Sequence, residues 1–125
     1  MSHSHAVDWI DHQTAQVLGF DAEHMQAKKI RSHHHYTRQH GSGVRTEHEY
    51  FGEVCDAVDG VAEVLVTGSH KALADFRHYV DKHRPHTAGR IVGYDVVDHR
   101  TDHQLVALAR KYLLTYDKSG LPPSA

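Results

Sequence analysis

Short apolar runs alternate with amphipathic helical segments through the second half of this chain, and this alternation is the feature that most limits its fold. Residues 62–67 and 91–97 are the two apolar runs. Apolar residues recur at helical spacing in residues 46–59, 69–84 and 101–116. Strands that alternate with helices pair in parallel through right-handed crossovers. The pattern therefore predicts two β-α-β units in this half of the chain.

The first half of the chain predicts an antiparallel meander. Residues 6–11 and 14–20 are β-prone runs separated by the polar pair His12-Gln13, which is typical of a hairpin, and residues 25–30 add a third strand. The expected fold is α/β, with a mixed five-stranded sheet flanked by helices in the order β-β-β-α-β-α-β-α. A length of 125 residues fits one domain. Its core is expected at about residues 5–116, followed by a flexible tail.

The predicted helices carry recognisable start signals. Thr46 and Glu49 stand at capping-box spacing, and so do Thr101 and Gln104, while Ser69 precedes the remaining helix as an N-cap. Gly60 and Pro85 mark the ends of the first two helices. Each helix should turn one apolar face to the sheet. The residues expected to face inward include Cys55, Phe76, Leu105 and Leu108.

A cationic segment without acidic residues, residues 31–45, interrupts the periodic sequence. Long structureless loops inside compact domains are usually functional or disordered. Arginine forks bind phosphates, aromatic rings stack on unpaired bases, and glycines allow close backbone approach. The segment therefore predicts a poorly ordered loop that binds RNA, although an inert solvated loop fits its composition too. The residues expected to contact RNA are Arg31, Tyr36, Arg38, Gln39, His40, Gly41, Gly43 and Arg45.

The order of elements resembles the catalytic middle domain of archaeal and eukaryotic peptide-chain release factors and their bacterial relatives, a ribonuclease-H-like group called translational machinery components. The similarity lies in the opening hairpin of residues 6–20, the third strand, and a polar glycine-containing loop before the first helix. A second match is the strand and glycine turn of residues 64–69, followed by Lys71 and Phe76. The resemblance implies a three-layer ribonuclease-H-like domain whose loop faces RNA or the ribosome.

In release factors this loop carries Gly-Gly-Gln, whose glutamine is presented to the ester of peptidyl-tRNA. Here Gln39 precedes Gly41 and Gly43. The resemblance therefore implies a ribosome- or RNA-binding module of the translation apparatus, with no catalytic residue assigned. The alternative function is that of a hydrolase of peptidyl-tRNA or a related ester. The third possible function is that of a histidine-mediated metal-binding protein.

Composition narrows the partners and the compartment. The formal net charge is -2, so nucleic-acid binding must be local, and structured RNA or the ribosome is expected rather than DNA. The 15 histidines make the charge sensitive to pH near 6.5, the usual pKa of imidazole. One cysteine excludes an internal disulfide. The chain has no apolar signal region or membrane-length run, which favours a cytoplasmic protein without a membrane partner. The oligomeric state stays open.

Two metal-dependent functions compete with ordinary structural roles for the histidines and acids of this chain. Neutral imidazole is a common zinc ligand, but adjacent side chains in extended backbone point in opposite directions, so no designed metal site and no cofactor are predicted from the histidine-rich loop and His48. A two-metal nuclease needs converging carboxylates. Strand alternation sends Asp8 and Asp11 to opposite faces, and all the available acids are expected to be strand-end or surface residues. These acids are Asp8, Asp11, Glu49, Glu53, Asp95 and Asp98.

Overall fold

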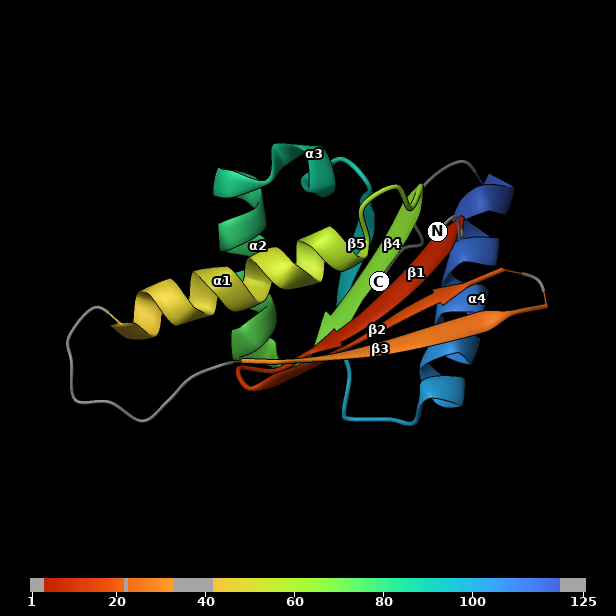
Figure 1. The fold of residues 1–125 in the computed structure, drawn as a ribbon. Coiled ribbons are helices and arrows are strands. Elements are labelled where there is room, and N and C mark those ends of the chain that lie inside the picture. The colour runs from red at the N-terminus through yellow and green to blue at the C-terminus, as the bar shows by residue number, and fades with distance from the viewer. Residues whose placement is uncertain (1–3, 22, 33–41, 120–125) are drawn as a thin grey trace.

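Five strands form one mixed sheet in the order β3-β2-β1-β4-β5 (Figure 1). The computed structural model describes residues 4–21, 23–32 and 42–119, with side chains at residues 4–21, 23–32 and 46–113. The central strand β1 pairs antiparallel with β2 and parallel with β4, which pairs parallel with β5. The predicted meander and parallel crossovers are confirmed. The strands are β1 (His5–Ile10), β2 (Thr14–Phe20), β3 (Met25–Arg31), β4 (Glu63–Gly68) and β5 (Ile91–Val96).

Helices cover both faces of the sheet. In Figure 1, α1 (Ser42–Ala57) and α2 (His70–His83) lie on one face, and α4 (Asp102–Ser119) lies on the other. The sequence did not predict α3 (Pro85–Ala88), a single turn that Pro85 opens at its first position. The last helix continues to Ser119 and therefore enters the segment expected to be a flexible tail. No helix in the described ranges is long and apolar enough to cross a membrane.

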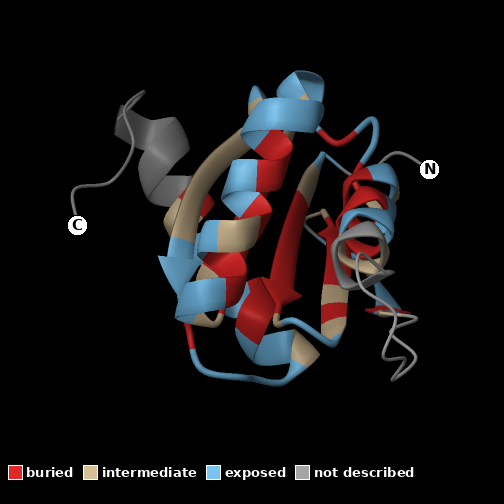
Figure 2. Cartoon of the chain, turned by 90° about the vertical axis from the view of Figure 1, so that its left-hand side faces the viewer, coloured by how far each residue is buried: buried red, intermediate tan, exposed pale blue. Residues whose placement is uncertain are grey.

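The sheet separates two apolar clusters. Figure 2 shows that the inward faces of the helices are buried, while their outer faces are exposed. On the α1/α2 face, Phe51, Phe76 and Val80 pack against Ile10 and Val66 of the strands. The α4 face is smaller. It consists of Val7, Trp9, Leu18, Phe20, Leu65, Leu105, Val106, Ala109 and Leu113.

The start of α4 forms as predicted. The backbone N–H of Thr101 donates to Oε1 of Gln104 at 3.0 Å, and the backbone N–H of Gln104 donates to Oγ1 of Thr101 at 3.2 Å. This reciprocal pair is the capping box that the sequence indicated. Leu105 is buried, but Leu108 is only half-buried, since it lies at the margin of the face that α4 packs on the sheet. The prediction that Leu108 faces fully inward is therefore corrected.

The predicted start of α1 at Thr46 is wrong. The helix begins at Ser42, so the capping-box spacing of Thr46 and Glu49 falls inside its second turn. A single glycine in a helix costs only about 1 kcal/mol relative to alanine, and Gly43 therefore does not stop the helix. At the other end, α1 stops at Ala57, and Gly60 follows with a positive φ of 86°. That backbone conformation explains the glycine.

A glycine also shapes the junction between β4 and α2. Gly68 has a φ of 151°, and a Cβ atom there would lie 2.0 Å from the carbonyl oxygen of Ile10. The chain therefore needs glycine where β4 passes closest to β1. Ser69 follows as the N-cap residue of α2, as predicted, but its side chain forms no capping hydrogen bond. This junction brings the start of α2 next to the end of β1.

Candidate functional site at the groove between α1 and α2

The predicted RNA-binding residues are only partly placed by the structure. Arg31 is exposed at the end of edge strand β3. Gly43 and Arg45 belong to the first turn of α1 rather than to the loop, because the helix starts at Ser42. The other predicted contacts, and the expected disorder of the loop, lie outside the described residues; these contacts are Tyr36, Arg38, Gln39, His40 and Gly41. The structure thus defines the two ends of the loop.

The returning end of the loop leads to the carboxyl ends of the central strands. The hydroxyl of Tyr50 in α1 donates to the carbonyl oxygen of Asp11, in the turn after β1, at 2.9 Å. Asp11 also holds this turn, because its Oδ1 accepts from the backbone N–H groups of Gln13 and Thr14, each at 2.7 Å. In α/β sheets, ligands bind preferentially at the carboxyl ends of the parallel strands. The first turns of α1, where the cationic segment ends, therefore lie near the end of the sheet at which a site is expected.

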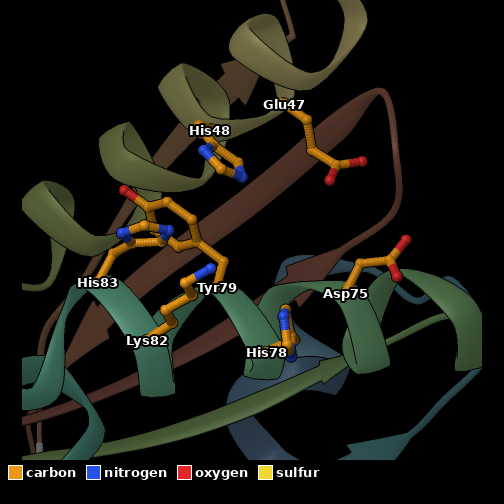
Figure 3. Close-up of a pocket in the computed structure, with 7 residues that line it drawn as sticks. All are labelled: Glu47, His48, Asp75, His78, Tyr79, Lys82 and His83. Carbon is orange, nitrogen blue, oxygen red and sulfur yellow. The ribbon is translucent and has the colours of Figure 1, made fainter.

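A pocket of about 140 Å³ lies in the groove between α1 and α2 (Figure 3). Figure 3 shows the carboxylates of Glu47 and Asp75 at one end of this pocket, with the rings of His48, Tyr79 and His83 at the other. The lining is polar and contains both acidic and basic side chains. The pocket lies beside the first turns of α1. The lining residues are Glu47, His48, Asp75, His78, Tyr79, Lys82 and His83.

Three aromatic rings lie together at the other end of the pocket. The ring centroids of His48 and Tyr79 are 5.1 Å apart, those of His48 and His83 are 5.2 Å apart, and those of Tyr79 and His83 are 5.1 Å apart. The sequence analysis did not predict this pocket. The available signal was the helical spacing of polar residues on α2, where Asp75, His78 and Lys82 follow one another at intervals that place them on one face.

The acids considered for a nuclease do not converge. Glu49, Glu53, Asp95 and Asp98 are exposed, and Asp11 is engaged in its turn. Within the described residues, none of these acids belongs to a group of three side chains that could bind one metal ion. The structure instead brings together His12, Glu47 and Asp75, which the sequence analysis did not connect. His48, which was considered as a ligand with the loop histidines, is not part of this group.

Asp8 corrects the expectation that these acids are strand-end or surface residues. Its side chain is 1% exposed in the middle of β1, beside Val17 of β2 and Val66 of β4. In the part of the chain that the structure describes, neither carboxylate oxygen has a hydrogen-bond partner, and the buried hydroxyl of Tyr94 also has none. Burial raises the pKa of Asp8 well above its usual value. The α1/α2 face therefore contains an acid that favours its neutral form.

Cys55 lies on this face too, and its position agrees with the sequence prediction. The thiol is buried, and desolvation raises its pKa to about 12. At neutral pH the nucleophilic thiolate is therefore negligible. Cys55 packs as an apolar residue in the α1/α2 cluster and does not serve as a nucleophile.

The fold is similar to parts of an archaeal translation termination factor and of two Pelota proteins, although no family model and no curated protein matches the sequence. Pelota of Archaeoglobus fulgidus superposes with a TM-score of 0.60 at 15% identity, over 91% of this chain and 32% of that one. The archaeal translation termination factor aRF1 gives 0.60 at 12% identity, over 93% of this chain and 39% of that one. Pelota of Thermoplasma acidophilum gives 0.59 at 17% identity, over 97% and 35%. The chain therefore spans about a third of these proteins and shares the fold of that part.

Proposed function

We propose that this domain is a translation-associated module that binds the ribosome or structured RNA through the cationic segment between β3 and α1. The observation that carries the proposal is the fold similarity to aRF1 and to two Pelota proteins over more than nine-tenths of the chain. We further assign the domain to the ribonuclease-H-like group and equate it with the middle domain of release factors. The strand order β3-β2-β1-β4-β5, with the loop placed between β3 and α1, supports both assignments.

Local charge supports the same surface. Lys28, Lys29 and Arg31 are exposed along edge strand β3, directly before the loop. The sequence adds Arg38 and Arg45 and no acid between residues 31 and 45. Phosphate contacts by lysine and arginine supply most sequence-independent affinity for nucleic acid. In this proposal, Arg31, Arg38 and Arg45 bind phosphates, Tyr36 and His40 stack on bases, and Gly41 and Gly43 let the backbone approach the RNA, with Gln39 as a further contact.

The proposal is a binding function rather than ester hydrolysis. Gln39 precedes the glycines, so the order of the release motif is not met. We therefore assign no residue of the loop or of the pocket to the hydrolysis of peptidyl-tRNA. Release of the labelled peptide from ribosome-bound peptidyl-tRNA by the purified protein would contradict this part and favour the hydrolase.

Co-sedimentation with purified ribosomes tests the proposal. The variant Arg31→Ala, Arg38→Ala, Arg45→Ala should bind at least about tenfold more weakly than the parent, because it loses three phosphate contacts. The matched control replaces three exposed arginines elsewhere, Arg77, Arg100 and Arg110, by alanine and should bind like the parent. Equal weakening by both triple variants would show that only total charge matters. Failure of the parent to sediment would remove the ribosome as the partner.

Titration of single-stranded RNA at several salt concentrations tests the loop without the ribosome. The logarithm of affinity falls with the logarithm of salt concentration by about 0.7 per neutralised phosphate on single strands. The loop variant should therefore lose up to about two units of slope, and the control variant should lose none. Affinity should also rise between about pH 7.5 and 6, because loop imidazoles gain charge. Identical slopes for the parent and the loop variant would show that RNA binds elsewhere.

A further inference from the structure

Three potential metal ligands from distant parts of the sequence meet at the end of the α1–α2 groove next to the β1–β2 turn. His12 comes from the β1–β2 turn, Glu47 from α1 and Asp75 from α2. One ligand atom from each lies within 4.8 Å of the other two, and Nε2 of His12 is 2.9 Å from Oδ2 of Asp75. No other such group occurs in the ranges that the structure describes. Figure 3 shows the carboxylates of Glu47 and Asp75 facing each other across the groove.

The charges of this cluster favour a cation. Two carboxylates at this separation repel each other, and in the described part of the chain only His12 pairs with Asp75 while nothing pairs with Glu47. Neutral imidazole offers a lone pair and no charge, so the cluster carries a charge of about -2 when His12 is neutral. A divalent cation placed between the three ligand atoms would neutralise both acids. It would also use the imidazole nitrogen as a donor.

We propose that His12, Glu47 and Asp75 bind a divalent first-row transition-metal ion, for which Zn²⁺ fits best. Magnesium and calcium prefer oxygen ligands alone, whereas zinc accepts imidazole and carboxylate together. Zinc lies about 2.0–2.2 Å from such ligands, so two donors on one ion are at most about 4.4 Å apart. The observed cluster needs only small side-chain movements to reach this geometry. With three protein ligands, the ion keeps a position for water.

The exposure of the three ligands, and the elements that they join, indicate what a bound ion would do. The side chains of His12 and Asp75 are 41% and 38% exposed, so the ion would be accessible from solvent and would not be a buried structural centre. Its ligands join the β1–β2 turn, α1 and α2. The Tyr50 hydroxyl already links α1 to the same turn. Metal binding would therefore tighten the start of α1, where the cationic segment ends, and would do so whether or not that segment binds RNA.

Isothermal titration of the full chain with Zn²⁺ tests the site. The parent should bind one ion tightly, and Glu47→Gln and Asp75→Asn should each weaken that event at least about tenfold, because each removes one of three ligands. The matched control replaces His33, His34 and His35 by alanine and should keep the tight event. Loss of that event in the control, with retention in Asp75→Asn, would show adventitious capture by the loop. A parent without stoichiometric binding would also overturn the proposal.

Thermal unfolding supplies a second readout. An ion that binds only the folded protein stabilises it, so excess Zn²⁺ should raise the melting temperature of the parent and of the loop-histidine control by several degrees. It should not raise that of Asp75→Asn. Circular dichroism of the metal-free variants verifies that they fold, as expected for half-exposed residues. Equal stabilisation of the parent and of Asp75→Asn would contradict a site at this cluster, as would an equal effect of Mg²⁺ on the parent.

Discussion

The two faces of the sheet differ in the polar groups that they bury. Under α4, the described side chains form an apolar cluster, and the single polar hydrogen of Trp9 is donated by Nε1 to the carbonyl oxygen of Val97 at 2.9 Å. Under α1 and α2, the cluster also encloses the carboxyl group of Asp8 and the hydroxyl of Tyr94, and neither group has a hydrogen-bond partner among the described residues. The groove between the two helices of this face holds the pocket lined by Glu47, Asp75 and Tyr79. The α1/α2 face therefore buries more polar atoms without a partner than the α4 face, where Oε1 of Gln16 is the one such atom in the described residues.

Despite this difference, both faces should depend on their apolar contacts. Phe76→Ala on the α1/α2 face should lower the free energy of unfolding by about 3–5 kcal/mol, and Leu105→Ala on the α4 face by about 2–5 kcal/mol. Both side chains are essentially inaccessible to solvent. Denaturant midpoints measure these losses. A loss below about 0.5 kcal/mol for either variant would show that its helix is not packed as described.

Asp8 should distinguish the faces through pH. Its pKa is raised in the folded protein, so the stability linked to its proton is fully present below the unfolded pKa and is lost as pH rises through the folded pKa. Over that window the parent should lose stability by about 1.4 kcal/mol per pH unit relative to Asp8→Asn, which has no such proton. Asp8→Asn should therefore be the more stable protein at neutral pH. Unfolding free energies between about pH 4 and 8 test this; parallel profiles would mean that Asp8 is not buried in the solution structure.

The smallest effect is expected at the edge of the α4 face. Leu108 is half-buried beside Gln104 and Lys111, so Leu108→Ala should cost about 1 kcal/mol, clearly less than Leu105→Ala one turn earlier. The difference between the two midpoints sharpens the assignment of the packed face. Equal losses would place Leu108 in the core, as its helical spacing alone suggested.

Most of the fold could be predicted from the periodicity of apolar residues in the sequence. The alternation of strands and helices, the hairpin turn at His12 and the capping box of Thr101 are local patterns, and the structure confirms them. Errors occurred where weak local signals compete. Thr46 has the spacing of a cap, yet the helix continues through Gly43, and the single turn of α3 is too short to produce a period.

The candidate site was much less accessible to sequence reasoning. His12, Glu47 and Asp75 lie on three different elements, and only the packing of α1 and α2 against the end of β1 brings them together. Alternation placed Asp8 on one face of the sheet, but it could not show that two helices seal that face. The cationic composition of residues 31–45, by contrast, is evident from the sequence itself. What the structure adds is its position between edge strand β3 and the groove.

Hydrogen exchange of the free and the ribosome-bound protein tests the central claim that the α1 side of the molecule carries the function. Binding should slow exchange at Arg31 and Ser32 and in the first turns of α1, which flank the cationic segment. Amides of α4 from Leu105 to Leu113 should exchange at the same rate in both samples. Slowing confined to α4, with unchanged exchange on both sides of the loop, would contradict the account.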